Sequence, residues 1–177
     1  MFGKKMVWGL CLCLLCMCAF GQDASDNSVI TKLTRAELVK MDGGKLGGAQ
    51  ALSEKKVIGL YFSAHWCPPC RSFTPKLVAF RNACVAKNQP FEIVFVSYDK
   101  NEQAMMEYMK GTKMGWVAVP FNSKLRNELG QHFNVRGIPS LIILDSKGNT
   151  LSTDGRGDVT RNGAKAYEMW AAKISEN

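Results

Sequence analysis

Two thiols separated by two residues are the chemical centre of this sequence. Cys67 and Cys70 lie in the segment YFSAHWCPPCRSF, residues 61–73. An apolar run precedes the pair and a helical pattern follows it, which predicts that a strand ends and a helix begins at Cys67. Thiols at this spacing serve in disulfide exchange, in metal ligation or as a structural crosslink.

The start of a helix favours the thiolate form of Cys67. Unpaired backbone N–H groups and the positive end of the helix dipole gather there. In such settings the pKa of a cysteine falls from about 8.5 to about 3.5–7.5. We therefore expect Cys67 to attack a disulfide. Cys70 lies one helical turn further along the chain, is shielded from solvent, and would resolve the mixed disulfide.

The residues around the pair modify this chemistry. Pro68 and Pro69 suit the first helical turn, where the missing N–H is not needed, and they stiffen the loop. They also remove two amides that would otherwise bond the Cys67 sulfur. His65 and Arg71 flank the pair and would compensate in part, although either one also fits the description of an exposed charge without a role.

Metal binding is the first alternative. Zinc prefers four ligands, and C-x-x-C supplies two. Beyond the pair, the part of the chain after residue 21 offers Cys84, His65 and His132, without a second C-x-x-C or an H-x₃-H motif. Copper delivery is a related alternative because the chain has nine methionines. We expect no bound metal at the pair, and no dissociable cofactor.

Adhesion is the second alternative, carried by Arg156-Gly157-Asp158. A tripeptide of this kind is frequent by chance, and a glycine-rich loop after an edge strand accounts for it. Cys84, on the long helix after the pair, is expected to be a buried small hydrophobe; a third redox thiol is the other reading.

The pair is positioned by alternating strands and helices. Strands are expected over 56–63, 91–99 and 140–145 and near Thr150, and helices over 33–41, 71–86, 101–110, 123–133 and 162–174. Strands separated by helices run parallel, whereas the last two, joined by a tight turn at 146–149, run antiparallel. This predicts an α/β domain with a mixed central sheet and helices on both faces.

Two local patterns precede the first long strand. Thr34 followed by Glu37 has the spacing of a capping box, which predicts the helix over 33–41. The glycines of DGGKLGG, residues 42–48, then favour a turn or a small hairpin.

The first 21 residues have the features of an export signal. Lys4 and Lys5 precede the uncharged apolar run 6–20, and the small residues Ala19 and Gly21 stand at the two positions that a signal peptidase reads. The expected organisation is a signal peptide over 1–21, a polar linker over 22–32 and one domain over 33–177. An uncleaved anchor, or lipidation at Cys16 or Cys18, is the alternative. Cleavage would make the protein periplasmic or secreted, and the membrane would be a partner only through an uncleaved signal.

Cysteine use and charge fit this organisation. Four of the seven cysteines lie in the signal, which leaves Cys67, Cys70 and Cys84. Export permits disulfides, but three cysteines are too few for a stapled scaffold. The net charge of +8 comes from basic residues scattered among acids, so we expect no nucleic-acid partner.

The sequence resembles the thioredoxin superfamily, and within it the tryparedoxin and nucleoredoxin group. The similarity is carried in order by GLYFSA, WCPPC and FTPKL, then by FEIVFVSYD, GWVAVPF and VRGIPSLIILD. It covers residues 57–145 and implies a thioredoxin fold with dithiol–disulfide exchange, with Cys67 attacking and Cys70 resolving. The partners it implies are protein disulfides and an unidentified electron donor or acceptor.

The resemblance also implies roles around the pair. Trp66 would be a surface aromatic beside the site, and Pro139 matches the proline that is cis in this superfamily. The backbone of Ile138 would pair with the substrate backbone.

The sequence departs from this pattern at three points. Thioredoxins proper carry a buried acid in the strand before the pair, where this chain has Tyr61. His65 replaces a small residue. The tryparedoxins and nucleoredoxins work inside cells, whereas this chain has an export-like start.

Overall fold

A computed structural model describes residues 28–174 of the chain, in which seven strands and seven helices alternate. The strands are β1 (Glu37–Val39), β2 (Lys45–Gly47), β3 (Val57–Ser63), β4 (Phe91–Ser97), β5 (Val117–Ala118), β6 (Ser140–Asp145) and β7 (Thr150–Ser152). The helices are α1 (Val29–Arg35), α2 (Gly48–Leu52), α3 (Pro68–Ala86), α4 (Glu102–Gly111), α5 (Lys124–His132), α6 (Gly155–Asn162) and α7 (Lys165–Ile174).

One mixed sheet in the order β2-β1-β5-β4-β3-β6-β7 organises the molecule. β3, β4 and β5 are parallel, while β6 is antiparallel to β3 and β7 is antiparallel to β6. The predicted mixed α/β sheet and its antiparallel final hairpin are therefore confirmed. Gly148, with a φ of +93°, closes the tight turn between β6 and β7, where glycine suffers no Cβ clash.

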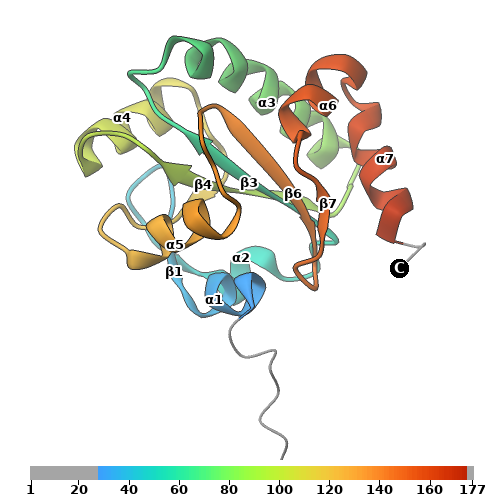
Figure 1. Ribbon diagram of the computed structural model, residues 1–177, viewed down its shortest axis with the longest axis horizontal. Coiled ribbons are helices and arrows are strands. Elements are labelled where there is room, and N and C mark those ends of the chain that lie inside the picture. Colours follow the sequence, from blue (N-terminus) through green and yellow to red (C-terminus); the bar gives the residue numbers. More distant parts are fainter. Residues whose placement is uncertain (1–27, 175–177) are drawn as a thin grey trace, which may run out of the picture.

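Side chains of the central strand point alternately to the two faces of the sheet. Val57 and Tyr61 belong to one buried cluster, and Ile58, Leu60 and Phe62 to the other. Helices α3, α4, α6 and α7 cover the first face, and α1, α2 and α5 cover the second, as Figure 1 shows. Because β3 is buried on both faces, its sequence is a continuous apolar run.

The helix expected over 33–41 is wrong. The helix α1 begins earlier, with the Ser28 side chain accepting the Thr31 N–H at 3.2 Å, and it ends at Arg35. Glu37 lies in β1, which pairs with β2 and places Val39 opposite Ala118 of β5. Pairing in the sheet buries Leu38 and Val39, so tertiary structure overrides the local capping pattern.

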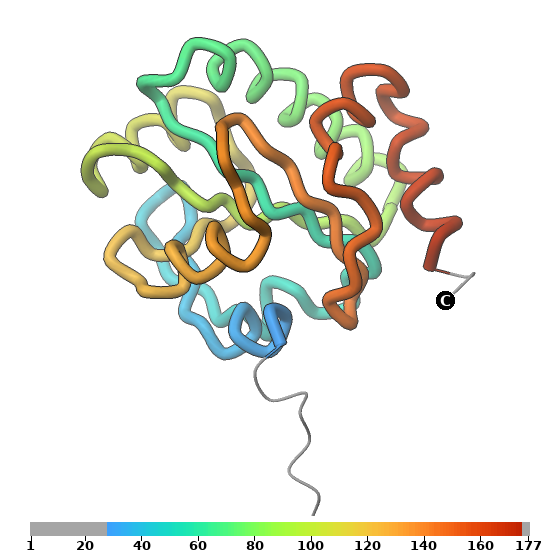
Figure 2. Tube along the Cα trace, viewed as in Figure 1, coloured from blue at the N-terminus to red at the C-terminus, as the bar shows by residue number. Residues whose placement is uncertain are grey.

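Two further boundaries differ from the expectation. The polar linker was expected to extend to Lys32, but α1 already packs Val29 and Leu33 into the core. The glycine-rich stretch forms the expected hairpin between β1 and β2, and then the short helix α2. Figure 2 shows this amino-terminal part, in blue, at the base of the molecule, away from the start of α3.

The expected signal peptide over 1–21 lies outside the described residues. From Ser28 to Ile174, the helices are all too short or too polar to cross a bilayer.

Candidate active site

The two thiols lie where the central strand passes into the longest described helix. Cys67 is the N-cap of α3, and Pro68 and Pro69 occupy its first two positions. Cys67 and Cys70 form a disulfide, with their Cα atoms 5.2 Å apart. Cys70 is fully buried, whereas Cys67 retains 3% of its surface. Only Cys67 can therefore be reached from solvent, as expected of an attacking sulfur.

A groove of about 490 Å³ opens beside Cys67. Trp66, Pro68 and Pro69 line it together with Tyr98 and the segment from Val135 to Ile138. Trp66 is 54% exposed and Tyr98 is 38% exposed. The lining is largely apolar, which suits an uncharged part of a polypeptide chain.

The structure brings the predicted substrate-binding segment to the disulfide. The Cys67 sulfur lies 3.7 Å from the carbonyl oxygen of Ile138, although 71 residues separate them. The Ile138–Pro139 bond is cis, as the resemblance implied. Pro139 is buried, and Ile138 is half-buried at the groove.

Three hydrogen bonds fix the loop before the disulfide. The His65 N–H donates to Asp99 Oδ1 at 2.7 Å, and the Trp66 indole donates to the Tyr98 carbonyl at 3.0 Å. The Arg71 guanidinium donates to the His65 carbonyl at 2.8 Å. The Arg71 side chain therefore binds a backbone carbonyl and places a positive charge near the cysteine pair, without a hydrogen bond to either sulfur.

A chain of buried hydroxyl groups lies beneath Cys70. Thr74 Oγ1 lies 2.7 Å from the Tyr61 hydroxyl and 2.5 Å from the Tyr108 hydroxyl, and it donates to the Cys70 carbonyl at 2.9 Å. Ser63 Oγ lies 3.2 Å from the Tyr108 hydroxyl. Burial, with the neighbouring Tyr108, raises the pKa of Tyr61 far above its ordinary value, so the Tyr61 hydroxyl keeps its proton.

His65 connects the loop to this hydroxyl chain. Its exposed ring stacks on Tyr108, with ring centroids 5.3 Å apart and planes 18° apart. The imidazole therefore covers the buried phenol, and no contact between its ring and the sulfurs is seen.

Several residues of the site escaped the sequence analysis. Tyr98 and Asp99 follow β4, Thr74 lies in α3 and Tyr108 lies in α4, so these residues meet only in the folded domain. One sequence signal was available, since Asp99 stands at the end of a long apolar run. Neighbouring parallel strands end at the same edge, so a carboxylate after β4 lies beside the end of β3.

The residues named for metal binding stay apart. In the described part of the chain, no three His, Cys, Asp or Glu side chains form a group that could hold a metal ion. Cys84 is the free cysteine of that part; it is buried in the cluster that contains Phe80 and Trp170, as expected of a small hydrophobe.

The RGD tripeptide lies in α6, and the expectation of a glycine-rich loop there is wrong. Asp158 accepts hydrogen bonds from Ser152 Oγ at 2.6 Å and from the Trp170 indole at 3.0 Å. A side chain on Gly157 would collide with Asp154, which caps the helix. Asp158 and Gly157 therefore make contacts within the domain, which removes the basis for the adhesion hypothesis.

Comparison with known proteins decides the family. The family model described as "Thioredoxin-like" matches residues 54–150, more than half of the chain. The chain belongs to the thioredoxin-like family. This membership confirms the predicted resemblance, and the thioredoxin-like segment includes the disulfide, β3, β4 and the Ile138–Pro139 turn.

Individual relatives place it near the nucleoredoxins and tryparedoxins. It is 39% identical to probable nucleoredoxin 1 of Arabidopsis thaliana over 135 residues, which are 75% of this chain and 23% of the relative. The crystal structure of a thioredoxin from Wuchereria bancrofti is 42% identical, with a TM-score of 0.69, over 80% of this chain and 97% of that one. Tryparedoxin from Trypanosoma brucei is 36% identical, with a TM-score of 0.68, over 80% and 97%.

The matched part covers nearly all of the solved thioredoxin chain, whereas it spans about a quarter of the first curated nucleoredoxins that the chain matches. Its thioredoxin-like fold and C-x-x-C pair are those of an oxidoreductase family.

Proposed function

We propose that this chain is an exported thiol–disulfide oxidoreductase of the protein-disulfide reductase type. The observation that carries the proposal is the Cys67–Cys70 disulfide at the start of α3, with Cys67 facing an apolar groove and Cys70 buried behind it.

The start of α3 assists Cys67 in its thiolate form. The positive end of a 19-residue helix dipole lies at this N-cap. Pro68 and Pro69 contribute no N–H, so the dipole carries more of the stabilisation than it would in a loop with free amides.

The exchange begins with the protein in its dithiol form. The Cys67 thiolate attacks one sulfur of the substrate disulfide, forming a mixed disulfide and releasing the other substrate sulfur as a thiolate, which takes up a proton. Cys70 loses its proton and attacks Cys67, which closes the intramolecular disulfide and releases the second substrate thiol. Two electrons pass to the substrate, and an external thiol or dithiol donor returns two electrons to the pair.

The groove supports a protein substrate. Cys67 is among its lining residues, and the Ile138 carbonyl is an acceptor 3.7 Å from the sulfur. A substrate in extended conformation would pair its backbone with Ile138, which adds hydrogen bonds to the apolar contacts with Trp66.

The sequence before Ser28 supports export. Lys4 and Lys5, the apolar run over 6–20 and the small residues before Gln22 form the pattern of a cleaved signal. Expression in a host with a secretion pathway, followed by amino-terminal sequencing, should give a chain beginning at Gln22. A chain retained in the cytosol with Met1 would contradict export and leave the redox proposal intact.

Cysteine variants test the redox function. We expect Cys67→Ser to abolish reduction of insulin disulfides, and Cys70→Ser to accumulate mixed disulfides that a reducing agent releases. Cys84→Ser serves as the control and should keep the activity, because Cys84 lies away from the groove. Full turnover by Cys67→Ser would refute the proposal.

The reduction potential of the pair tests the direction. A reductase should have a reduction potential of about −250 mV, whereas an oxidant of substrate thiols should have one of about −130 mV. Equilibration with glutathione, followed by trapping of free thiols, measures the potential. A value of about −130 mV would replace the reductase proposal by a thiol-oxidant function.

A further inference from the structure

The groove beside Cys67 continues into a second hollow. Tyr98 and Val135 line both, so the two hollows adjoin along these residues. The second hollow has a volume of about 460 Å³. Its other lining residues come from α5 and the turn after it, namely Asn127, Gly130, Gln131 and Asn134.

Polarity changes along this continuous surface. Next to the disulfide the walls are Trp66, the two prolines and Ile138, whereas beyond Tyr98 they are amide side chains. Gly130 leaves room for the Tyr98 side chain between the two hollows, because a Cβ at residue 130 would collide with the Tyr98 hydroxyl. A chain that follows the surface meets apolar contacts first and hydrogen-bonding groups next.

Arg136 is the one permanently charged residue among those that line the two hollows. It is exposed, and its Nε donates to Asn134 Oδ1 at 3.3 Å. Within the described residues no carboxylate forms an ion pair with it. Its guanidinium therefore retains donors for a group outside the protein.

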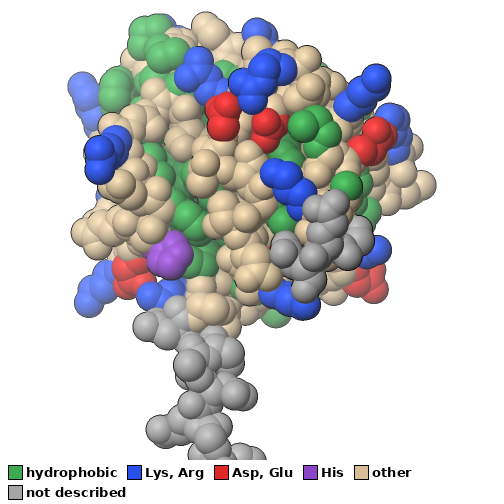
Figure 3. Space-filling model, turned by 45° about the vertical axis from the view of Figure 1, so that its right-hand side comes forward, with side chains coloured by type: hydrophobic (Ala, Val, Ile, Leu, Met, Phe, Trp, Pro, Cys, Tyr) green, Lys and Arg blue, Asp and Glu red, His purple; other side chains and the backbone are tan. Residues whose placement is uncertain are grey.

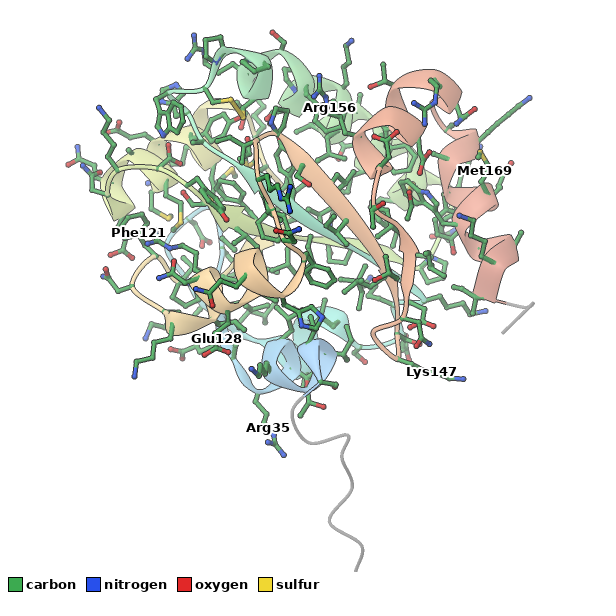
Figure 4. All side chains as sticks on the ribbon, in the orientation of Figure 1. Arg35, Phe121, Glu128, Lys147, Arg156 and Met169 are labelled. Atoms are coloured by element: carbon green, nitrogen blue, oxygen red, sulfur yellow. A yellow bond between two sulfur atoms is a disulfide. The ribbon has the colours of Figure 1, made fainter. Side chains whose placement is uncertain are left out.

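The surroundings of Tyr98 do not offset this positive charge. Arg126 lies beyond Tyr98, with its guanidinium 4.2 Å from the centre of the Phe121 ring. Phe121 is labelled at the left of Figure 4. Asp99, the acid nearest in sequence, is buried, and its oxygens accept from His65 and Ser97. On the face that Figure 3 shows, basic and acidic side chains are interspersed.

We infer that this surface selects polypeptide disulfides that carry an acidic residue about two positions from the attacked cysteine. The inference rests on the proposed function. A guanidinium pairs with a carboxylate through two parallel hydrogen bonds, which favours Asp or Glu over other side chains.

The spacing follows from the geometry of the Val135–Ile138 segment. The cysteine of the substrate must reach Cys67, which lies beside the Ile138 carbonyl. Arg136 precedes Ile138 by two residues, and the segment bends from Gly137 onward, so an extended chain beside it passes the Arg136 side chain within about two residues of its cysteine. An apolar residue in between would contact Trp66 or Tyr98.

Three peptide disulfides test the inference. They share one sequence and carry Glu, Gln or Lys two positions from the cysteine. The dithiol form of the protein is mixed with each oxidised peptide, and the second-order rate constant is measured at low salt. We expect the Glu peptide to react about fivefold faster than the Gln peptide, which is the size of a surface ion pair, and the Lys peptide to react slowest. High salt should reduce the difference.

Two charge-reversal variants separate Arg136 from the overall charge. Arg136→Glu should reverse the order of the Glu and Lys peptides. Lys147→Glu changes the net charge equally, but Lys147 lies in the β6–β7 turn at the other end of β6 from Pro139, as Figure 4 shows, and should keep the order of the unchanged protein. The Gln peptide should react at similar rates with the unchanged protein and with Lys147→Glu.

Each outcome bears on a different claim. Equal rates for the three peptides, or the same order in both variants, would overturn the selection by Arg136 while leaving disulfide exchange established. Reaction with none of the peptides would instead contradict the proposed function. Oxidised glutathione is a small acidic disulfide; if it matched the Glu peptide and lost rate equally in Arg136→Glu, recognition of a polypeptide would be refuted.

Discussion

The hydroxyls of Tyr61 and Thr74 lie 2.7 Å apart in the interior, directly beneath the resolving cysteine. Thr74 donates to the Cys70 carbonyl, so its two lone pairs are free to accept from Tyr61 and Tyr108. Thioredoxins proper carry a carboxylate in the strand before the pair, where this chain has Tyr61. Here a buried hydroxyl network positions the first turn of α3.

Removal of the central hydroxyl tests this network. We expect Thr74→Val to lower the free energy of unfolding by about 1–3 kcal/mol, because two buried phenols lose their acceptor. Urea unfolding of the oxidised protein measures it. Ser72→Ala is the control, since Ser72 makes the same kind of bond to the carbonyl four residues earlier but on the exposed side of the helix. Equal stability of the two variants would contradict the role of Thr74.

Asp99 should control the geometry of the attacking loop. In Asp99→Ala the His65 N–H and the Ser97 hydroxyl lose their acceptor. We expect the disulfide-exchange rate to fall by about an order of magnitude as the loop loosens, with faster hydrogen exchange at the His65 amide. Asp42→Ala removes a similar bond, from the Gly44 N–H in the β1–β2 hairpin, and should leave the rate unchanged. An unchanged rate in Asp99→Ala would exclude this positioning role.

Cys84 should be unreactive in the folded protein. Burial raises the pKa of its thiol to about 11, and the charges of Lys87 and Arg81 oppose this only in part. At pH 8 such a thiol is ionised to roughly one part in a thousand. Mass spectrometry after iodoacetamide treatment should show no label at Cys84 until urea unfolds the chain. Rapid labelling of the native protein would show that the site is open.

The same thiol makes stability depend on alkaline pH. The neutral thiol is favoured in the folded state, so its contribution is complete below about pH 9 and is lost as the pH rises toward about 11. Unfolding free energies should therefore decrease over that interval, and less steeply in Cys84→Ala. Parallel curves for the two proteins would contradict the pKa direction.

Asp158 should contribute to stability, with no part in adhesion. Burial opposes its ionised form, but bonds from Ser152 and Trp170 and the charges of Arg161 and Lys173 lower its pKa overall. Its contribution is present above the ordinary carboxyl pKa and is lost as the pH falls through the lower folded value. We expect Asp158→Asn to cost about 1–3 kcal/mol at pH 7 and less at pH 2, by urea unfolding.

Glu168→Gln, an exposed change on the neighbouring helix, is the control for Asp158. It should alter stability by less than about 0.5 kcal/mol. A cost for Asp158→Asn that is equal at both pH values would show that the carboxylate charge is not involved.

The long buried strands and the cysteine pair were predictable from local sequence. A strand such as β3 is covered on both faces, which requires a continuous apolar run. The proximity of Ile138 to Cys67 came from the resemblance, because no local rule joins residues 71 positions apart.

The short elements were not predictable because their stability comes from distant residues. β5 has two residues and exists through pairing with β4 and β1. In α6 the glycines suggested a loop, yet Gly155 packs so tightly against Ile143 and the Leu141 carbonyl that a side chain would collide there. Arg136 carries no pattern of its own and gains meaning only from the groove that it lines.

Helix α1, where the described chain begins, lies at the opposite end of β6 from the active groove. Ile30 lies against Gly148, in the turn at the carboxyl end of β6, while Pro139 and the disulfide lie at its amino end. The six residues of β6 separate these points by roughly 20 Å. If the segment before Ser28 held the protein at a membrane, Cys67 would therefore face outward, toward substrates arriving from the aqueous side.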